Sequence, residues 1–330
     1  MKKIFFSIIA VAAVAACTKT EPTYQPEAAD IMLNPTTALS TKANVNGVID
    51  GTVYPTSENF DVYAYWSNDW SKGDPTDYFR TPKDSGAEFE YSGGSWKGAN
   101  TAYHWPKDGS VKFAAYSPAS VNLKHTYATD TYYTTGYTQP SATDATYDLL
   151  LAKTTADYTA ESAANGVPVV FEHALSWITI NVISDVTTSK AFTIKEMTIN
   201  GVNTKADLKA AMADGIQYNE WSNQSTPAGY KVFAGSQTVT NTLAKIENNN
   251  GGTIVIPQVP TTLTIKFDQN QLAGTAALPN QQIDLSLALA RDNKWAPGRH
   301  YTYTIIFSLD EILINPSVND WADSYAYDII

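Results

Sequence analysis

The sequence predicts a mostly β protein built of antiparallel sandwiches, and three observations lead to this prediction. Strand-favouring aromatic residues are abundant, with 20 Tyr and 8 Trp among 330 residues. Several short segments alternate apolar and polar residues with a period of two, as strands with one buried face do. Turn-forming pairs such as Asn46-Gly47 and Pro297-Gly298 separate the segments, and scarcely any segment shows a helical period.

These period-two segments and short apolar runs give the expected elements in chain order. In 59–66, one face would carry Phe60, Val62, Ala64 and Trp66, and the other Asp61, Tyr63 and Tyr65. The apolar set of 192–199 changes phase after Ile194, which indicates a β-bulge. Thr204–Ala213 is expected to form the one short helix. The strands are expected at 45–53, 59–66, 88–91, 111–116, 148–152, 178–182, 192–199, 253–256, 263–267, 283–289 and 301–307.

The chain begins with a pattern typical of export. Two lysines precede an apolar run, 4–16, whose ~13 residues at 1.5 Å rise are too short for ~30 Å of hydrocarbon, so 1–16 is expected to be a signal peptide. Cys17, the only cysteine, follows Val14-Ala15-Ala16 as in a bacterial lipobox, where the cysteine is acylated after cleavage. The alternative is an ordinary signal peptide with a chance cysteine.

Composition also suggests a division of the exported part. Residues 17–42 are expected to form a tether or removable segment that includes the short apolar patch Ile31-Met32-Leu33. Between 154 and 166 the chain is rich in Ala, Thr, Ser and Asn and has no apolar period. We therefore expect one β-sandwich domain over 43–166 and a second over 167–330.

The charge and the motifs exclude several functions. A net charge of −11 without a basic stripe argues against nucleic acid as a partner. The four histidines share no metal-ligand spacing, and no cofactor is expected. Asp69, Asp74 and Asp77 could hold calcium from one loop but miss the EF-hand pattern. Glu172 beside His173 is weak evidence for acid–base chemistry, and nothing in the sequence indicates an enzyme.

Several blocks, in order along nearly the whole chain, resemble the fimbrillins, or type V pilins, which are lipoprotein-derived pilus subunits of anaerobic Gram-negative bacteria. The blocks are Val53-Tyr54-Pro55 with Phe60-Asp61-Val62-Tyr63-Ala64-Tyr65, Tyr103-His104-Trp105-Pro106, Phe113-Ala114-Ala115-Tyr116-Ser117-Pro118, Asp148-Leu149-Leu150, Val167-Pro168-Val169-Val170-Phe171-Glu172-His173, and Trp295-Ala296-Pro297-Gly298-Arg299-His300-Tyr301 running to Val318-Asn319-Asp320-Trp321.

This resemblance implies two sandwiches of transthyretin-like topology and a pilus subunit that supports adhesion. It implies an outer-membrane lipoprotein at the cell surface, acylated at Cys17 and trimmed by a trypsin-like protease between Lys42 and Ala43. Loss of the first strand would leave a groove, which the C-terminal segment of another pilus subunit fills. Candidate residues of this donor strand are Leu313, Val318, Trp321, Tyr325, Tyr327 and Ile329.

Three alternatives stay open at this point. Lys42 could be an unprocessed lysine in a linker, and 312–330 could only complete its own domain. The chain could instead be a surface lipoprotein that binds a host glycan or protein through aromatic loops, because Trp and Tyr offer broad faces for stacking. That platform would consist of Trp66, Trp70, Tyr78, Trp96 and Trp105, which could equally cap one end of the first sandwich.

Overall fold

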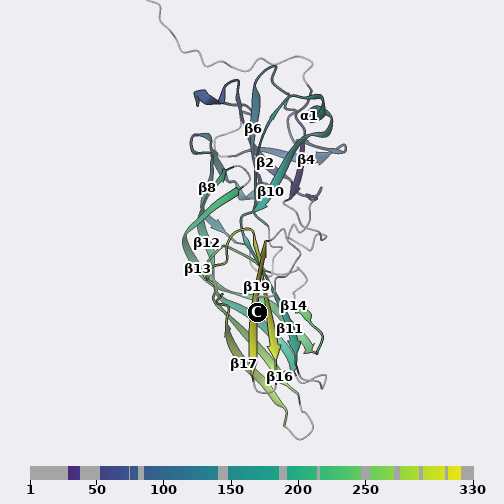
Figure 1. Cartoon of the computed structure of the whole chain (residues 1–330), viewed down its shortest axis with the longest axis vertical. Coiled ribbons are helices and arrows are strands. Elements are labelled where there is room, and N and C mark those ends of the chain that lie inside the picture. Colours follow the sequence, from purple (N-terminus) through teal and green to yellow (C-terminus); the bar gives the residue numbers. More distant parts are fainter. Residues whose placement is uncertain are drawn as a thin grey trace, which may run out of the picture.

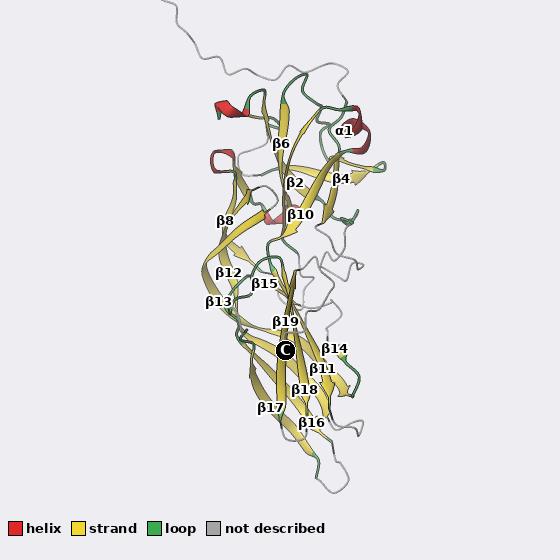
Figure 2. Ribbon diagram, in the orientation of Figure 1, coloured by secondary structure: helices red, strands yellow, loops and turns green. Residues whose placement is uncertain are grey.

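The computed structural model describes residues 29–37, 53–73, 75–80, 85–139, 148–185, 192–213, 216–246, 253–270, 276–289, 293–308 and 311–320. Strands dominate these ranges, as predicted, and the helical pieces are short (Figure 2). The helical pieces are α1 (Ala160–Asn165), η1 (Trp70–Lys72), η2 (Ala119–Val121) and η3 (Tyr127–Thr129). No helix in the described ranges is long and apolar enough to cross a membrane.

Eight strands form the first sheet, and all except β3 (Thr76–Asp77) close into a ring. The sheet closes because β2 pairs on both of its sides, with β4 and with β6. Around the ring the order is β2 (Phe60–Ser67), β4 (Ala87–Ser92), β5 (Ser95–Gly98), β1 (Leu33–Thr37), β10 (Val167–His173), β9 (Leu150–Asp157) and β6 (Ser110–Ser117). The prediction of a sandwich for 43–166 is therefore wrong: these strands, with β1 and β10, enclose their core within one closed sheet.

Two further sheets pack face to face in the rest of the molecule. The β11 sheet contains β14 (Ala244–Ile246), β11 (Ser176–Ser184), β18 (Arg299–Phe307), β19 (Ile312–Asp320) and β15 (Thr253–Val255). The β12 sheet contains β17 (Leu278–Ser286), β16 (Thr262–Gln269), β12 (Phe192–Ala213), β13 (Ile216–Val239), β8 (Thr131–Thr138) and β7 (Lys124–Thr126). Side chains from both sheets share one apolar core. Nothing in this strand order identifies a transthyretin-like topology, which stays a prediction.

The molecule is elongated, with the ring at one end and β14, β16 and β17 toward the other (Figure 1). The long strands β12 and β13 run between the two regions. Pairing crosses the expected boundary at residue 166 in both directions, because β10 lies in the ring while β7 and β8 lie in the β12 sheet. Pairing is also not wholly antiparallel, since β1–β10 and β11–β18 are parallel.

Several sequence expectations can be compared with single elements. The alternation of 59–66 is confirmed: Phe60 and Trp66 face the ring core, and Tyr63 and Tyr65 face outward. The outer face is nevertheless buried too, because β7, β8 and β12 cover it. The bulge is confirmed by a register shift between Ile194 and Glu196.

The predicted helix at Thr204–Ala213 is wrong, because this segment is the second half of β12. It pairs with β8 on one side and β13 on the other. Ala206, Leu208 and Ala210 are buried in alternation, which is a strand period. Two neighbouring strands thus override the helix propensity of an alanine-rich segment.

Asp61 is a buried carboxyl group on the outer face of β2. Its Oδ2 accepts a hydrogen bond of 2.7 Å from the hydroxyl of Tyr116 on the neighbouring strand β6. Burial raises the pKa of Asp61 from 3.8 to about 6, although the Tyr116 hydrogen bond opposes this shift. The ionised form is therefore less stable in the folded protein than in the unfolded chain.

We predict that Asp61→Asn removes a pH dependence of stability between pH ~4 and ~7. A raised folded-state pKa means that the native chain binds more protons in this window, so the free energy of unfolding falls as pH rises. A shift of about two units corresponds to about 3 kcal/mol at most. Urea unfolding at pH 4, 5, 6 and 7 would show the free energy of unfolding of the variant rising relative to that of the wild type as pH increases. If the two free energies changed with pH in parallel, the raised pKa of Asp61 would be contradicted.

Candidate functional site

The strand β1 occupies an interior position in the ring, between β5 and β10. Its residues pair in parallel with β10 from Leu33↔Val167 to Thr37↔Phe171, and Leu33 also pairs with Trp96 of β5. The amide of Ile31, just before the strand, donates to the Tyr103 carbonyl at 2.6 Å. A segment near the N-terminus therefore completes the sheet.

The side chains of β1 and the residues before it alternate between the core and the surface. Ile31 and Leu33 are 1% and 2% exposed and belong to the ring core, and Thr37 is buried as well, whereas Asn34 points outward. Full burial of each of the two large aliphatic side chains stabilises the fold by about 1.5–3 kcal/mol. The segment thus serves as both a sheet strand and a core plug.

The residues next to β1 form an apolar wall that contains several rings. On β10, Val167, Val169 and Phe171 are buried, and Tyr54 packs against Trp96 and Phe171 with ring centroids 5.2 Å apart in both pairs. If β1 were absent, β5 and β10 would carry unpaired backbone groups beside this apolar strip. We call this location, lined by β5, β10 and Tyr54, the β1 slot.

Gly166 allows the chain to enter β10 directly beside β1. Its φ is +76°, and an added Cβ would lie 2.9 Å from the carbonyl carbon of Leu33. The next amide, Val167 N–H, donates to the Met32 carbonyl at 2.8 Å. Glycine is therefore required here both by backbone conformation and by close approach.

The sequence-predicted site residues fall into two groups. Lys42 and Ala43, the lipidation residue Cys17, and the donor residues Trp321, Tyr325, Tyr327 and Ile329 lie outside the described residues. Leu313 and Val318 lie in β19, which pairs with β18 along Ile312–Asp320. They face opposite sides: Leu313 is 48% exposed, and Val318 packs against the core of its own chain. Two side chains on opposite faces cannot both be anchors in one apolar groove.

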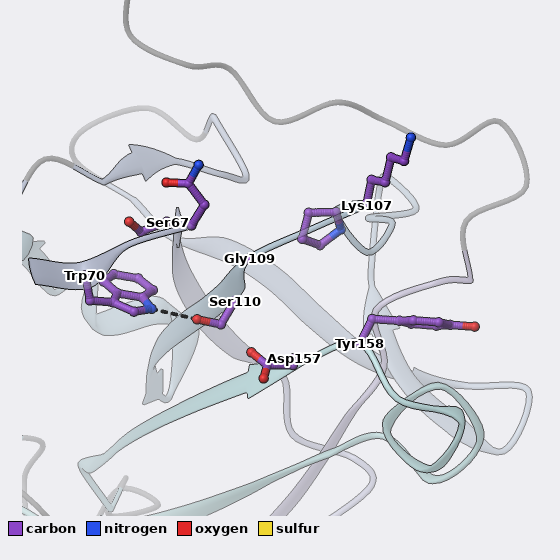
Figure 3. A pocket seen from close by; sticks show the side chains of 9 residues that line it. Ser67, Trp70, Lys107, Gly109, Ser110, Asp157 and Tyr158 are labelled. Atoms are coloured by element: carbon purple, nitrogen blue, oxygen red, sulfur yellow. Dashed lines mark hydrogen bonds between the residues drawn. The ribbon is translucent and has the colours of Figure 1, made fainter. Parts of the chain in front are cut away.

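The proposed aromatic platform is not formed. Trp66, Tyr78, Trp96 and Trp105 are at most 6% exposed and belong to the ring core. Trp70 is half-buried and lines an open pocket of about 400 Å³ near the ends of β2, β6 and β9, where its Nε1 donates to Ser110 Oγ at 2.6 Å (Figure 3). The remaining residues of this pocket are Ser67, Asn68, Pro106, Lys107, Gly109, Asp157 and Tyr158. Burial of the other four rings removes the stacking surface that the glycan-binding alternative requires.

The histidines take part in local polar contacts. His173 Nδ1 lies 2.7 Å from Asp148 Oδ2, and His104 Nδ1 lies 2.9 Å from Asp30 Oδ1 beside β1. His125 is buried, and burial lowers its pKa. Within the described ranges no three His, Cys, Asp or Glu side chains group as metal ligands. Of the proposed calcium loop, Asp69 accepts hydrogen bonds from Ser71, and Asp74 lies outside the description.

Sequence reasoning missed the specific role of residues 31–37. It identified Ile31-Met32-Leu33 only as an apolar patch, and it did not identify Gly166 or Trp96 as neighbours of that segment. The alternation of Ile31, Leu33 and Thr37 with polar or flexible residues was available as a signal, although the proline at position 35 weakens it.

Comparison with known proteins agrees with this architecture. A family model described as fimbrillin-like matches residues 41–321. A fimbrial protein from Bacteroides vulgatus has a similar structure, with a TM-score of 0.58 and 18% identity, covering 89% of this chain and 99% of that one. A candidate cell adhesion protein from Bacteroides uniformis has a TM-score of 0.52 and 18% sequence identity, and the match covers 88% of this chain and 99% of that one. These structural likenesses show a shared fold. The comparison with curated proteins found no match.

We predict that Gly166→Ala loosens β1 selectively. The new Cβ would press on the Leu33 carbonyl, so we expect a cost of about 1–3 kcal/mol and faster amide exchange at Leu33, Asn34 and Val167 than in the wild type. Gly73→Ala is the control, since Gly73 also has positive φ (+66°) but a Cβ there would meet nothing within 4 Å. Unchanged exchange in β1 would contradict the close-contact assignment.

Proposed function

Because the chain belongs to the fimbrillin-like family, we propose that it is a pilus subunit that polymerises by strand donation after its N-terminal strand is removed. The observation that carries this proposal is the interior position of β1 in the ring. A strand that fills an interior position near one end of the chain can be lost by a single cut, and its loss leaves a defined vacancy.

The cut would fall between Lys42 and Ala43, in the connection between β1 and Val53. Cleavage there leaves β1 attached to the ring only by hydrogen bonds and core contacts. The segment that departs carries Ile31 and Leu33 with it, so the β1 slot opens to its full depth. Trimming thus converts a closed ring into an acceptor.

The vacated slot offers what a donor strand needs. The edges of β5 and β10 provide backbone hydrogen-bonding groups, and the strip of Tyr54, Trp96 and Phe171 accepts alternate apolar side chains. The donor would come from residues 312–330 of another subunit. Such a contact joins two different surfaces, so it propagates as a filament unless it closes on itself.

Export and anchoring complete the proposal. The signal 1–16 directs the chain out of the cytoplasm, and acylation of Cys17 holds it at the outer membrane until trimming releases the anchored segment. The partners are therefore other pilus subunits, with the membrane as a temporary attachment and adhesion as the role of the finished fimbrium.

We predict that Lys42→Gln blocks trimming and assembly. A trypsin-like protease needs a cation before the cut, so the variant should keep its N-terminal segment and stay monomeric. Lys42→Arg is the matched control and should be trimmed like the wild type. Mass spectrometry of the mature N-terminus and detergent-resistant ladders on gels provide the measurements. A mature N-terminus other than Ala43, or ladders from Lys42→Gln, would count against the proposal.

We also predict that Cys17→Ser abolishes incorporation of labelled palmitate into the exported precursor. Acylation requires the thiol, which serine cannot replace, and the chain has no other cysteine. Because trimming removes this segment, polymer formed from the trimmed wild-type chain should carry no label. Labelled Cys17→Ser precursor would show that the signal is not a lipobox.

A further inference from the structure

Two segments far apart in the chain have nearly the same sequence. Residues 31–37 read Ile-Met-Leu-Asn-Pro-Thr-Thr, and residues 312–318 read Ile-Leu-Ile-Asn-Pro-Ser-Val. The isoleucine, asparagine and proline are identical, and each of the other positions exchanges side chains of similar size. The first segment contains β1, and the second is most of β19.

The two segments also turn the same positions inward. In the first, Ile31, Leu33 and Thr37 are buried and Asn34 is exposed. In the second, Ile312, Ile314 and Val318 pack against a core, while Leu313 and Asn315 are exposed. The likeness therefore extends from sequence to the face that each strand buries.

We propose that residues 312–318 of one copy occupy the β1 slot of the next copy in the register of residues 31–37, parallel to β10. This inference rests on the proposed strand donation and names the donor segment and its alignment. Ile312, Ile314, Pro316 and Val318 would take the places of Ile31, Leu33, Pro35 and Thr37.

The β1 slot would bury the apolar face of residues 312–318 more completely than the edge of the β11 sheet does. Among the described strands of its own chain β19 is an edge strand that pairs with β18 alone, and Ile312 and Ile314 remain partly exposed. In the slot their counterparts Ile31 and Leu33 are at most 2% exposed, and β1 has neighbours on both sides. Transfer would bury more of the donor's own apolar face, which favours donation, whereas the uncovering of β18 opposes it.

The proline makes other registers unfavourable. A shift of one residue would turn Asn315 into the core and the isoleucines outward. A shift of two residues could place Pro316 at the position of Leu33, where pairing with both Val167 and Trp96 makes a missing N–H costly. In the proposed register, Pro316 falls where the slot already holds Pro35, which pairs with Val169.

The inference can be tested by disulfide formation between subunits. In the proposed alignment Ser317 takes the place of Thr36, opposite Val170, which is 49% exposed and tolerant of substitution. Full-length Ser317→Cys and Val170→Cys chains are trimmed at Lys42, which also removes Cys17, then mixed, assembled and oxidised. We expect a disulfide-linked pair with one chain of each kind, identified by mass spectrometry of the linked peptides.

Two controls define the geometry. Thr36→Cys with Val170→Cys in an untrimmed Cys17→Ser chain should form the same bond within one molecule, which establishes that this pair can be bridged. Asn315→Cys replaces Ser317→Cys as the out-of-register donor. It would lie about 7 Å further along the strand, so its yield should be about tenfold lower.

The outcomes separate the inference from the function on which it rests. Preferential linkage from Asn315→Cys would overturn the register. Ladders without linkage from either donor would place the donor elsewhere, for example at 324–330, and overturn this inference while strand donation stands. If the trimmed wild-type chain forms no ladders at all, strand donation itself fails.

A second variant tests the same segment without a bridge between chains. Thr302 of β18 lies opposite Ser317 in the home sheet. A Thr302→Cys/Ser317→Cys chain should therefore fasten β19 to its own subunit when oxidised. We expect ladders to fall about tenfold under oxidation and to return with reductant. Equal ladders in both conditions would show that β19 does not leave its sheet.

Discussion

The pairing of β1 with β10 is the interaction on which the closed ring depends. A ring with an odd number of strands cannot alternate in direction all the way around, so at least one neighbouring pair must be parallel. Among the ring pairings, β1–β10 is the parallel pair, and the others are antiparallel. Closure of the ring therefore depends on β1, the first strand of the described chain. The remaining six strands form an antiparallel sheet without it.

That remaining sheet has support that does not involve β1. The outer faces of β2, β6 and β9 are buried against β8 and β12 through a cluster to which β1 contributes no side chain. Within this layer the Tyr132 hydroxyl donates to the carbonyls of Ala115 and Ala152, and the Tyr63 hydroxyl donates to the Leu123 carbonyl. Lys153 Nζ reaches Asp130 Oδ2 at 2.7 Å. Because these contacts hold β2, β6 and β9 from outside, this part of the sheet would keep its support if β1 were lost.

The sequence predicted the strands in which apolar and polar residues alternate clearly. It did not predict the features that depend on which strands lie next to each other in the fold. The alternation of 59–66 specified both faces of β2, but only the fold revealed that β7, β8 and β12 cover the second face. Thr204–Ala213 reads as a helix because alanine favours one, and no local pattern announces that β8 and β13 flank it. Closure of the ring has no local signature either, since it depends on β2 pairing at both edges. The repeated heptapeptide, in contrast, is visible in the sequence, but its meaning depends on knowing where each copy packs.

If residues 312–318 also occupy the β1 slot of another copy, as proposed, the slot and the edge of β18 would compete for the same segment. While β1 fills the slot, residues 312–318 have the edge of β18 as their one partner strand in the described part of the chain, and the apolar faces of both segments lie against cores within one molecule. Removal of β1 would change only one side of this competition, because it would create a deeper site with two strand edges. The pairing with β18 would still have to be broken first, so assembly would wait for release of β19 even after the slot is open. Under this proposal the precursor would be protected twice against premature assembly: its acceptor would be occupied, and its donor would be paired.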